Sequence, residues 1–99
     1  MSTTTLDLPA NLTISTAEAL HEKLEPLLLK DSDIAIVGKD VERVDTAGLQ
    51  LVLAFKNALV KRNLGFTWKN YSDALFNAAL QLGLEKHLAL DSAKPKKGS

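Results

Sequence analysis

The residues of this sequence best suited to chemistry stand together in the segment Val44-Asp45-Thr46-Ala47-Gly48-Leu49, just before a long segment of helical character. Asp45 or Thr46 can serve as the N-cap of that helix, and Gly48 allows its first turn to lie close to neighbouring backbone. The unpaired N–H groups and the dipole at a helix start also favour a phosphate or another anion. Phosphorylation of Thr46 would place negative charge beside Asp45 and repel an acidic partner. The segment thus has a structural interpretation and a binding one.

The rest of the sequence offers little for catalysis or metal binding. There are no cysteines, and neither His21 nor His87 has a partner at a metal-ligand spacing. Further acidic residues gather in turns without the spacing of a calcium loop or a phosphate-binding glycine loop: Asp31, Asp33, Asp40 and Glu42. We therefore expect a protein that is not an enzyme and that needs no cofactor or metal.

Two strands and a helix are predicted in the first third of the chain. Thr3–Leu8 has β-branched, alternating character and Leu12–Ile14 follows a proline-containing turn, which predicts an N-terminal hairpin. Ser15–Glu18 matches a capping box, and leucines at helical spacing continue to about Lys30. Pro26 predicts a kink or an early end of that helix, because proline removes a backbone donor.

The remainder of the chain continues the alternation. Asp33–Val37 is apolar on both faces, which predicts a central strand covered on both sides. Leu49–Arg62 is the strongest helical segment, and Leu64–Lys69 suits a strand. Ser72 can cap a third helix that Gly83 ends. We predict an α/β fold of order ββαβαβα, with helices packed on a mixed, partly parallel sheet of four to five strands.

The helix Leu49–Arg62 has more apolar surface than one stripe requires. Steps of 100° place one stripe toward the sheet, formed by Gly48, Leu51, Val52, Phe55, Ala58 and Leu59. A flank of the same helix carries Leu49, Leu53, Lys56 and Val60. The surplus is either a partner surface or a face that a neighbouring helix covers.

Composition bounds the class of protein and its location. Lys+Arg and Asp+Glu number 12 each, so the chain lacks the positive charge that attracts nucleic acid or an anionic membrane. The polar start has no signal-peptide pattern, and the longest apolar stretch, Leu51–Phe55, is far too short to insert across a membrane. We expect one domain at residues 1–90, a flexible polar and basic tail at residues 91–99, and a cytoplasmic location.

On the segment Asp45-Thr46-Ala47-Gly48-Leu49, placed between a strand and an amphipathic helix, the chain resembles the bacterial STAS family. Members carry an Asp-Ser/Thr-x-Gly-Leu signature there, and the resemblance extends over roughly residues 3–90. In the family's anti-sigma factor antagonists, a kinase phosphorylates the hydroxyl residue directly before the glycine. That position is Ala47 in this chain, so that switch does not carry over. Thr46 is the remaining possible phosphoacceptor or docking hydroxyl.

The resemblance implies a non-catalytic regulatory or adaptor module that docks on a signalling protein. The expected contact residues are Asp45, Thr46, Ala47, Gly48, Leu49, Leu53, Lys56 and Val60. Candidate partners are an anti-sigma factor or serine kinase, a chemotaxis-type histidine kinase, or the ATPase of a phospholipid-transport ABC complex, to which an accessory STAS subunit binds. The residues themselves leave a further interpretation open, in which a small anionic ligand or nucleotide binds at the same helix start.

Overall fold

The computed structural model describes residues 3–88 and residue 90. Its elements are β1 (Thr3–Asp7), β2 (Asn11–Leu12), α1 (Ile14–Leu28), β3 (Asp33–Gly38), β4 (Arg43–Val44), α2 (Thr46–Lys61), β5 (Phe66–Tyr71) and α3 (Asp73–Gln81). The α/β class is confirmed, and the predicted order gains one two-residue strand, β4, between β3 and α2. The predicted tail at residues 91–99 lies outside the described residues.

The strands form two parallel sheets, and the predicted N-terminal hairpin is wrong. β1, β3 and β5 lie in that order in the larger sheet, with Leu6 beside Ile36 and Ile36 beside Trp68. β2 pairs instead with β4, in parallel, in a sheet of two strands. Ala10 anchors this second sheet, because its carbonyl accepts the N–H groups of Glu42 (2.7 Å) and of the residue after it. β2 therefore pairs with a strand that is distant in sequence, and the apolar β3 lies beside β1.

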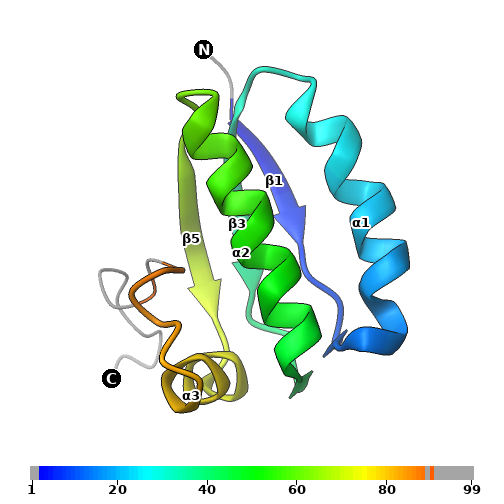
Figure 1. Ribbon diagram of the computed structural model, residues 1–99, viewed down its shortest axis with the longest axis vertical. Coiled ribbons are helices and arrows are strands. Elements are labelled where there is room, and N and C mark those ends of the chain that lie inside the picture. The colour runs from blue at the N-terminus through cyan, green and yellow to red at the C-terminus, as the bar shows by residue number, and fades with distance from the viewer. Residues whose placement is uncertain (1–2, 89, 91–99) are drawn as a thin grey trace.

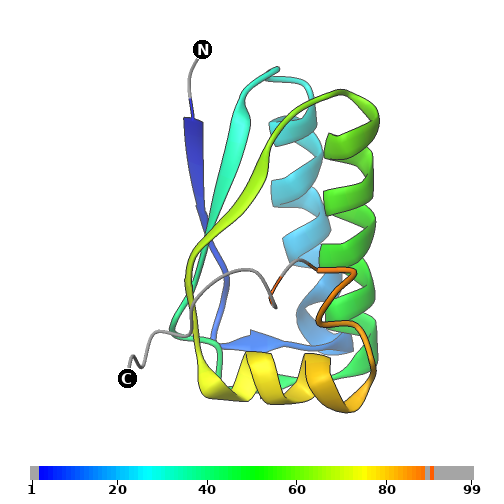
Figure 2. The same ribbon diagram turned by 90° about the vertical axis from the view of Figure 1, so that its left-hand side faces the viewer.

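The two long helices lie side by side on one face of the larger sheet, and α3 lies across one end of this layer (Figures 1 and 2). Ile34 and Ile36 of β3 are fully buried on the helix face. In the described part of the chain the opposite face carries no helix (Figure 2), so the prediction of two covered faces is wrong. Ala35 is nevertheless buried on that open face, and Val37 is half-buried. Small side chains in a central strand are shielded by the strands on either side.

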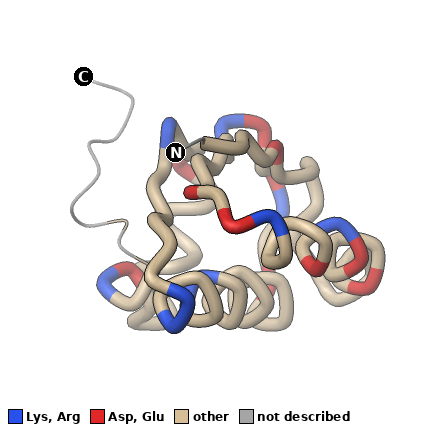
Figure 3. The backbone as a smooth tube through the Cα atoms, turned by 90° about the horizontal axis from the view of Figure 1, so that it is seen from above, with Lys and Arg blue, Asp and Glu red and all other residues tan. Residues whose placement is uncertain are grey.

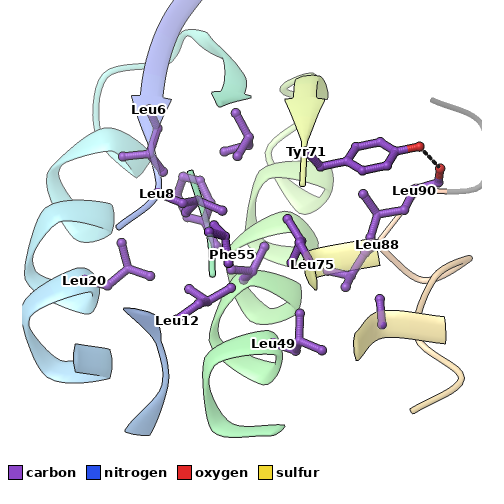
Figure 4. Packing of buried hydrophobic residues seen from close by; sticks show 14 of the residues in the cluster. Leu6, Leu8, Leu12, Leu20, Leu49, Phe55, Tyr71, Leu75, Leu88 and Leu90 are labelled. Atoms are coloured by element: carbon purple, nitrogen blue, oxygen red, sulfur yellow. Dashed lines mark hydrogen bonds between the residues drawn. The ribbon is translucent and has the colours of Figure 1, made fainter. Parts of the chain in front are cut away.

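One apolar core fills the space between the sheet, the two long helices and the segment after α3, residues 84–88 and 90, called the closing segment (Figure 4). Leu88 and Leu90 of that segment are fully buried. Two aromatic side chains of β5 form hydrogen bonds with the backbone of the closing segment. Trp68 Nε1 donates to Leu88 O (2.8 Å), and Tyr71 Oη donates to Leu90 O (3.2 Å). Each fully buried leucine contributes about 1.5–3 kcal/mol through removal of apolar surface from water. The closing segment is therefore part of the domain, without forming a helix or strand of its own.

The first helix begins two residues earlier than its predicted capping box implies, and it passes through its proline. Thr13 is the N-cap, and its N–H donates to Thr16 Oγ1 (3.2 Å), so the capping box predicted at Ser15–Glu18 is wrong. Pro26 lies inside α1, which nevertheless continues to Leu28. The early end predicted near Pro26 is therefore wrong, because only the last turn lies beyond the missing donor.

The third helix has the predicted boundaries. Ser72 is its N-cap and accepts the N–H of Leu75 at Oγ (3.1 Å). The helix ends at Gln81, and Gly83 follows with a φ of +71°, the left-handed conformation that commonly ends a helix. The Ser72 hydroxyl also donates to Val41 O (2.7 Å), which fixes the start of α3 against the segment that leads to β4.

Candidate functional site

Asp45 caps two helices at once. It is the N-cap of α2, where its Oδ1 accepts the N–H of Gly48 (2.9 Å), and its Oδ2 accepts the N–H of Ile14, the first residue of α1 (2.9 Å). These hydrogen bonds, first that of Ile14 and then that of Gly48, hold the pKa of the Asp45 carboxyl below its usual range. The predicted choice between Asp45 and Thr46 as cap is thereby settled in favour of Asp45. The carboxylate joins the starts of two helices that are 31 residues apart in sequence.

Gly48 lies directly against the backbone of β2, as predicted from its position in the first turn. A Cβ added to Gly48 would meet the carbonyl oxygen of Leu12 at 2.0 Å and its carbonyl carbon at 2.5 Å. The same Leu12 oxygen accepts the N–H of Asp45 (3.1 Å). The start of α2 is thus fixed to β2 by a hydrogen bond and by a contact that only glycine allows.

Above this junction, three side chains face outward. Thr46, the first residue of α2, is exposed, and Ala47 is half-buried. Ile14 is 71% exposed although it is a large apolar residue. Its N–H donates to Oδ2 of Asp45, the residue directly before Thr46. Sequence reasoning missed Ile14 because it was assigned to a strand; the signal that could have found it is Thr13, a good N-cap that places Ile14 first in the helix.

The predicted contact residues of α2 divide into buried and exposed ones. Leu49 is fully buried, so its assignment as a partner contact is wrong, and Gly48 is buried against β2. Leu53 and Lys56 are half-buried, and Leu53 packs against the core. Val60 is 55% exposed but lies near the opposite end of α2 from Asp45. The flank is therefore largely covered from within the domain.

The buried stripe of α2 also differs from the predicted one. Its buried residues are Gly48, Leu49, Val52, Phe55 and Leu59. Leu51 and Ala58, predicted to face the sheet, are only half-buried and line a groove of about 100 Å³ between α1 and α2. Leu75 and Ala79 of α3 are fully buried, and Leu75 belongs to the same core cluster as the buried residues of α2.

The other residues that could take part in catalysis or metal binding do not gather into a site. His21 is exposed, and its Nε2 lies 3.7 Å from Glu25 Oε2. His87 is exposed in the closing segment. Asp33 Oδ1 accepts the N–H of Gly65 (2.7 Å) and so serves a turn. Within residues 3–88 and 90, no group of three or more His, Asp or Glu could hold a metal ion. Acidic and basic residues are interspersed over the described chain (Figure 3).

No helix in the described ranges has both the length and the apolar character needed to cross a membrane.

Comparison with known proteins identifies the family. A family model described as "Mlab, STAS domain" matches residues 1–91. The chain belongs to the STAS domain family. Its fold is similar to that in the crystal structure of a sulfate transporter family protein from Wolinella succinogenes, with a TM-score of 0.69 and 15% identity, over 87% of this chain and 70% of that one. No curated protein matches the chain in sequence.

Family membership places the junction of β4 and α2 in context. STAS domains are generally non-catalytic and generally mediate protein–protein interactions. In this STAS domain the Asp-Thr-x-Gly-Leu signature lies where Asp45 and Gly48 join α1, β2 and α2. The acid and the glycine of the signature therefore have structural roles here, and Thr46 is the signature residue whose side chain is left facing solvent.

Proposed function

We propose that this STAS domain is a non-catalytic regulatory or adaptor module that docks on a signalling protein through Ile14, Asp45, Thr46 and Ala47, together called the docking surface. The observation that carries the proposal is the bond from the Ile14 N–H to Asp45 Oδ2. It joins the backbone of an exposed isoleucine to the acid of the family signature, and the next residue of the signature, Thr46, is also exposed. Partner surfaces combine such an apolar anchor with nearby polar groups.

The charge of Asp45 favours a protein partner over an anion. Its carboxylate accepts the N–H groups of Ile14 and Gly48, which are the donors that an anion would need. A phosphate at this place would also meet the negative charge of Asp45 itself. The helix starts that suggested a small anionic ligand or nucleotide are thus already occupied by the protein's own carboxylate. Binding of an uncharged, partly apolar protein surface needs none of these donors.

The proposal includes three classes of partner and a cytoplasmic location. The partners are an anti-sigma factor or its serine kinase, a chemotaxis-type histidine kinase, and the ATPase of an ABC transporter for phospholipids. Ala47 carries no hydroxyl group, so control by phosphorylation at that position is ruled out. Thr46, exposed at the first position of α2, is the acceptor that remains, and added charge there would weaken a contact with an acidic partner.

An affinity pull-down from native lysate with matched variants tests the proposal. Thr46→Glu adds charge and bulk at the docking surface, and a glutamate at a helix start is compatible with the helix dipole. Ile14→Gln removes the exposed apolar group. Val60→Glu is the control, because it introduces the same glutamate on an exposed position near the far end of the same helix. We expect a kinase or ATPase, identified by mass spectrometry, that wild type and Val60→Glu retain and the other two variants lose.

Two results would count against this assignment. A partner retained equally by all four proteins would place the contact elsewhere on the domain. A rise in the thermal midpoint with ATP or inorganic phosphate, together with no partner that depends on Thr46 or Ile14, would favour the small-ligand interpretation, because a ligand selective for the native state raises the midpoint.

A further inference from the structure

The outer edge of β1 presents free backbone groups. In the parallel pair with β3, the Leu8 N–H donates to Val37 O (2.9 Å). Alternation along a parallel strand then directs the backbone groups of the even-numbered residues toward β3 and those of Thr3, Thr5 and Asp7 outward. Within the described ranges no strand lies on that outer side, since β1 is at the end of the sheet. The edge offers three N–H donors and three carbonyl acceptors at the spacing of a strand.

Helix α1 overhangs the position beside this edge. It stands beyond β1, on the side away from β3 (Figure 1), and in the layer of helices above one face of the sheet (Figure 2). A cavity of about 170 Å³ opens on this side of α1, and it is lined by Pro9, Thr16, Ala19, Leu20 and Lys23. The lining is mainly apolar, with one lysine at the rim. An added strand would therefore find backbone partners in β1 and an apolar cover in α1.

The two edges of the sheet differ in how they are protected. The pairing of β5 with β3 has an irregularity between Ile36 and Val37, and β5 carries the exposed Lys69. The closing segment also contacts this edge strand through the bond from Trp68 Nε1 to Leu88 O. Bulges, lysines and covering segments are the usual means by which proteins block strand addition. β1, with the sequence Thr-Thr-Thr-Leu-Asp and regular pairing, has none of these.

We propose that the outer edge of β1 accepts an extended segment of a partner protein, which adds as an antiparallel strand beneath α1. The segment has alternating side chains: apolar ones face α1 and its cavity, polar ones face the open side, and a basic one lies opposite Asp7. This surface is separate from the docking surface. A second copy is a poorer occupant, because pairing β1 with β1 about a two-fold axis would bring a second α1 into the same overhanging space (Figure 1).

A designed peptide tests the edge directly. In antiparallel register, acetyl-Leu-Lys-Val-Thr-Val-Thr-amide places its leucine at the cavity, its lysine opposite Asp7 and a threonine opposite Thr5. Titrated into the ¹⁵N-labelled 99-residue protein, it should shift the amides of Thr3, Thr5 and Asp7 and slow their hydrogen exchange. A peptide of the same composition without alternation is the control and should leave these amides unchanged.

Matched variants separate strand addition from other binding. Thr5→Pro removes an outward N–H and leaves the bonds to β3 in place, so it should weaken peptide binding about tenfold, the loss expected when one donor is removed and its acceptor is left unpaired. Thr5→Val keeps the amide and should bind like wild type. Ala19→Arg, which fills the cavity from an exposed position, should also weaken binding, and Thr46→Glu should not.

Four results would overturn the proposal. The first is no peptide-induced shift at the three edge amides at millimolar peptide. The second is equal binding by wild type, Thr5→Pro and Ala19→Arg. The third is a change at the edge amides that depends on protein concentration alone, which would assign the edge to a second copy. Loss of binding in Thr46→Glu would instead merge this site with the docking surface, and that too would contradict it.

Discussion

Gly48→Ala should destabilise the fold strongly for a change of one methyl group. The new Cβ would lie 2.0 Å from Leu12 O, whereas a carbon and a carbonyl oxygen rarely approach closer than about 3.3 Å. The start of α2 or the backbone of β2 must therefore shift by about 1 Å. That shift strains the packing by about 1–3 kcal/mol and weakens the bond from Asp45 N to Leu12 O, worth about 1 kcal/mol more.

The better helix propensity of alanine returns about 1 kcal/mol, which leaves a net loss of about 1–3 kcal/mol. Equilibrium unfolding in urea measures this loss directly as a lower transition midpoint. Gly65→Ala is the control, since the nearest atoms that its Cβ would meet belong to the Asp33 side chain, at 3.2 Å, and not to backbone. A free energy of unfolding for Gly48→Ala within about 0.5 kcal/mol of wild type, the range of ordinary surface substitutions, would refute the close-approach argument.

Two further substitutions probe the bonds described above. The Asp45 pKa is lowered in the folded protein, so its carboxylate stabilises the fold above the unfolded-state pKa and this contribution is lost as the pH falls through the folded-state pKa. Asp45→Asn should therefore lower the thermal midpoint at pH 7, with a difference from wild type that shrinks below about pH 4; a difference independent of pH would contradict the assignment. Tyr71→Phe removes the bond to Leu90 O and should cost about 1 kcal/mol in urea unfolding, and an unchanged midpoint would mean that this bond does not stabilise the closing segment.

Elements whose signals are local could be predicted from the sequence. Ser72 caps α3 and Gly83 follows its end, as their types and positions indicate. Gly48 lies against backbone, and Asp45 caps α2. The caps act within one turn of the chain, so sequence spacing shows them. The glycines lack a side chain, and this indicates either close approach to backbone or the end of a helix. The α/β class follows from the alternation of such segments.

Features decided by distant residues could not be predicted. The first strand and Leu12 are near neighbours in sequence, which favoured a hairpin, but the apolar β3 competes for β1 and β4 competes for Leu12. The bond from the Ile14 N–H to Asp45 Oδ2 joins residues that are 31 apart in sequence, and no local pattern contains that bond. Leu49 is fully buried in the core although it lies on a flank of α2, so periodicity within α2 alone could not assign it to the core.

The parallel pairing of every described strand also bears on how fast the chain can fold. β1 meets β3, and β3 meets β5, only after a segment containing a helix has closed into a loop between them. No sheet bond can form between neighbours in the chain, so a hairpin cannot serve as an early nucleus. The entropy of loop closure is lost before any stabilising bond between strands forms. This slows folding relative to helical domains of equal length. The two long helices can form first, and the bond from Asp45 to Ile14 can close only when their starts have met.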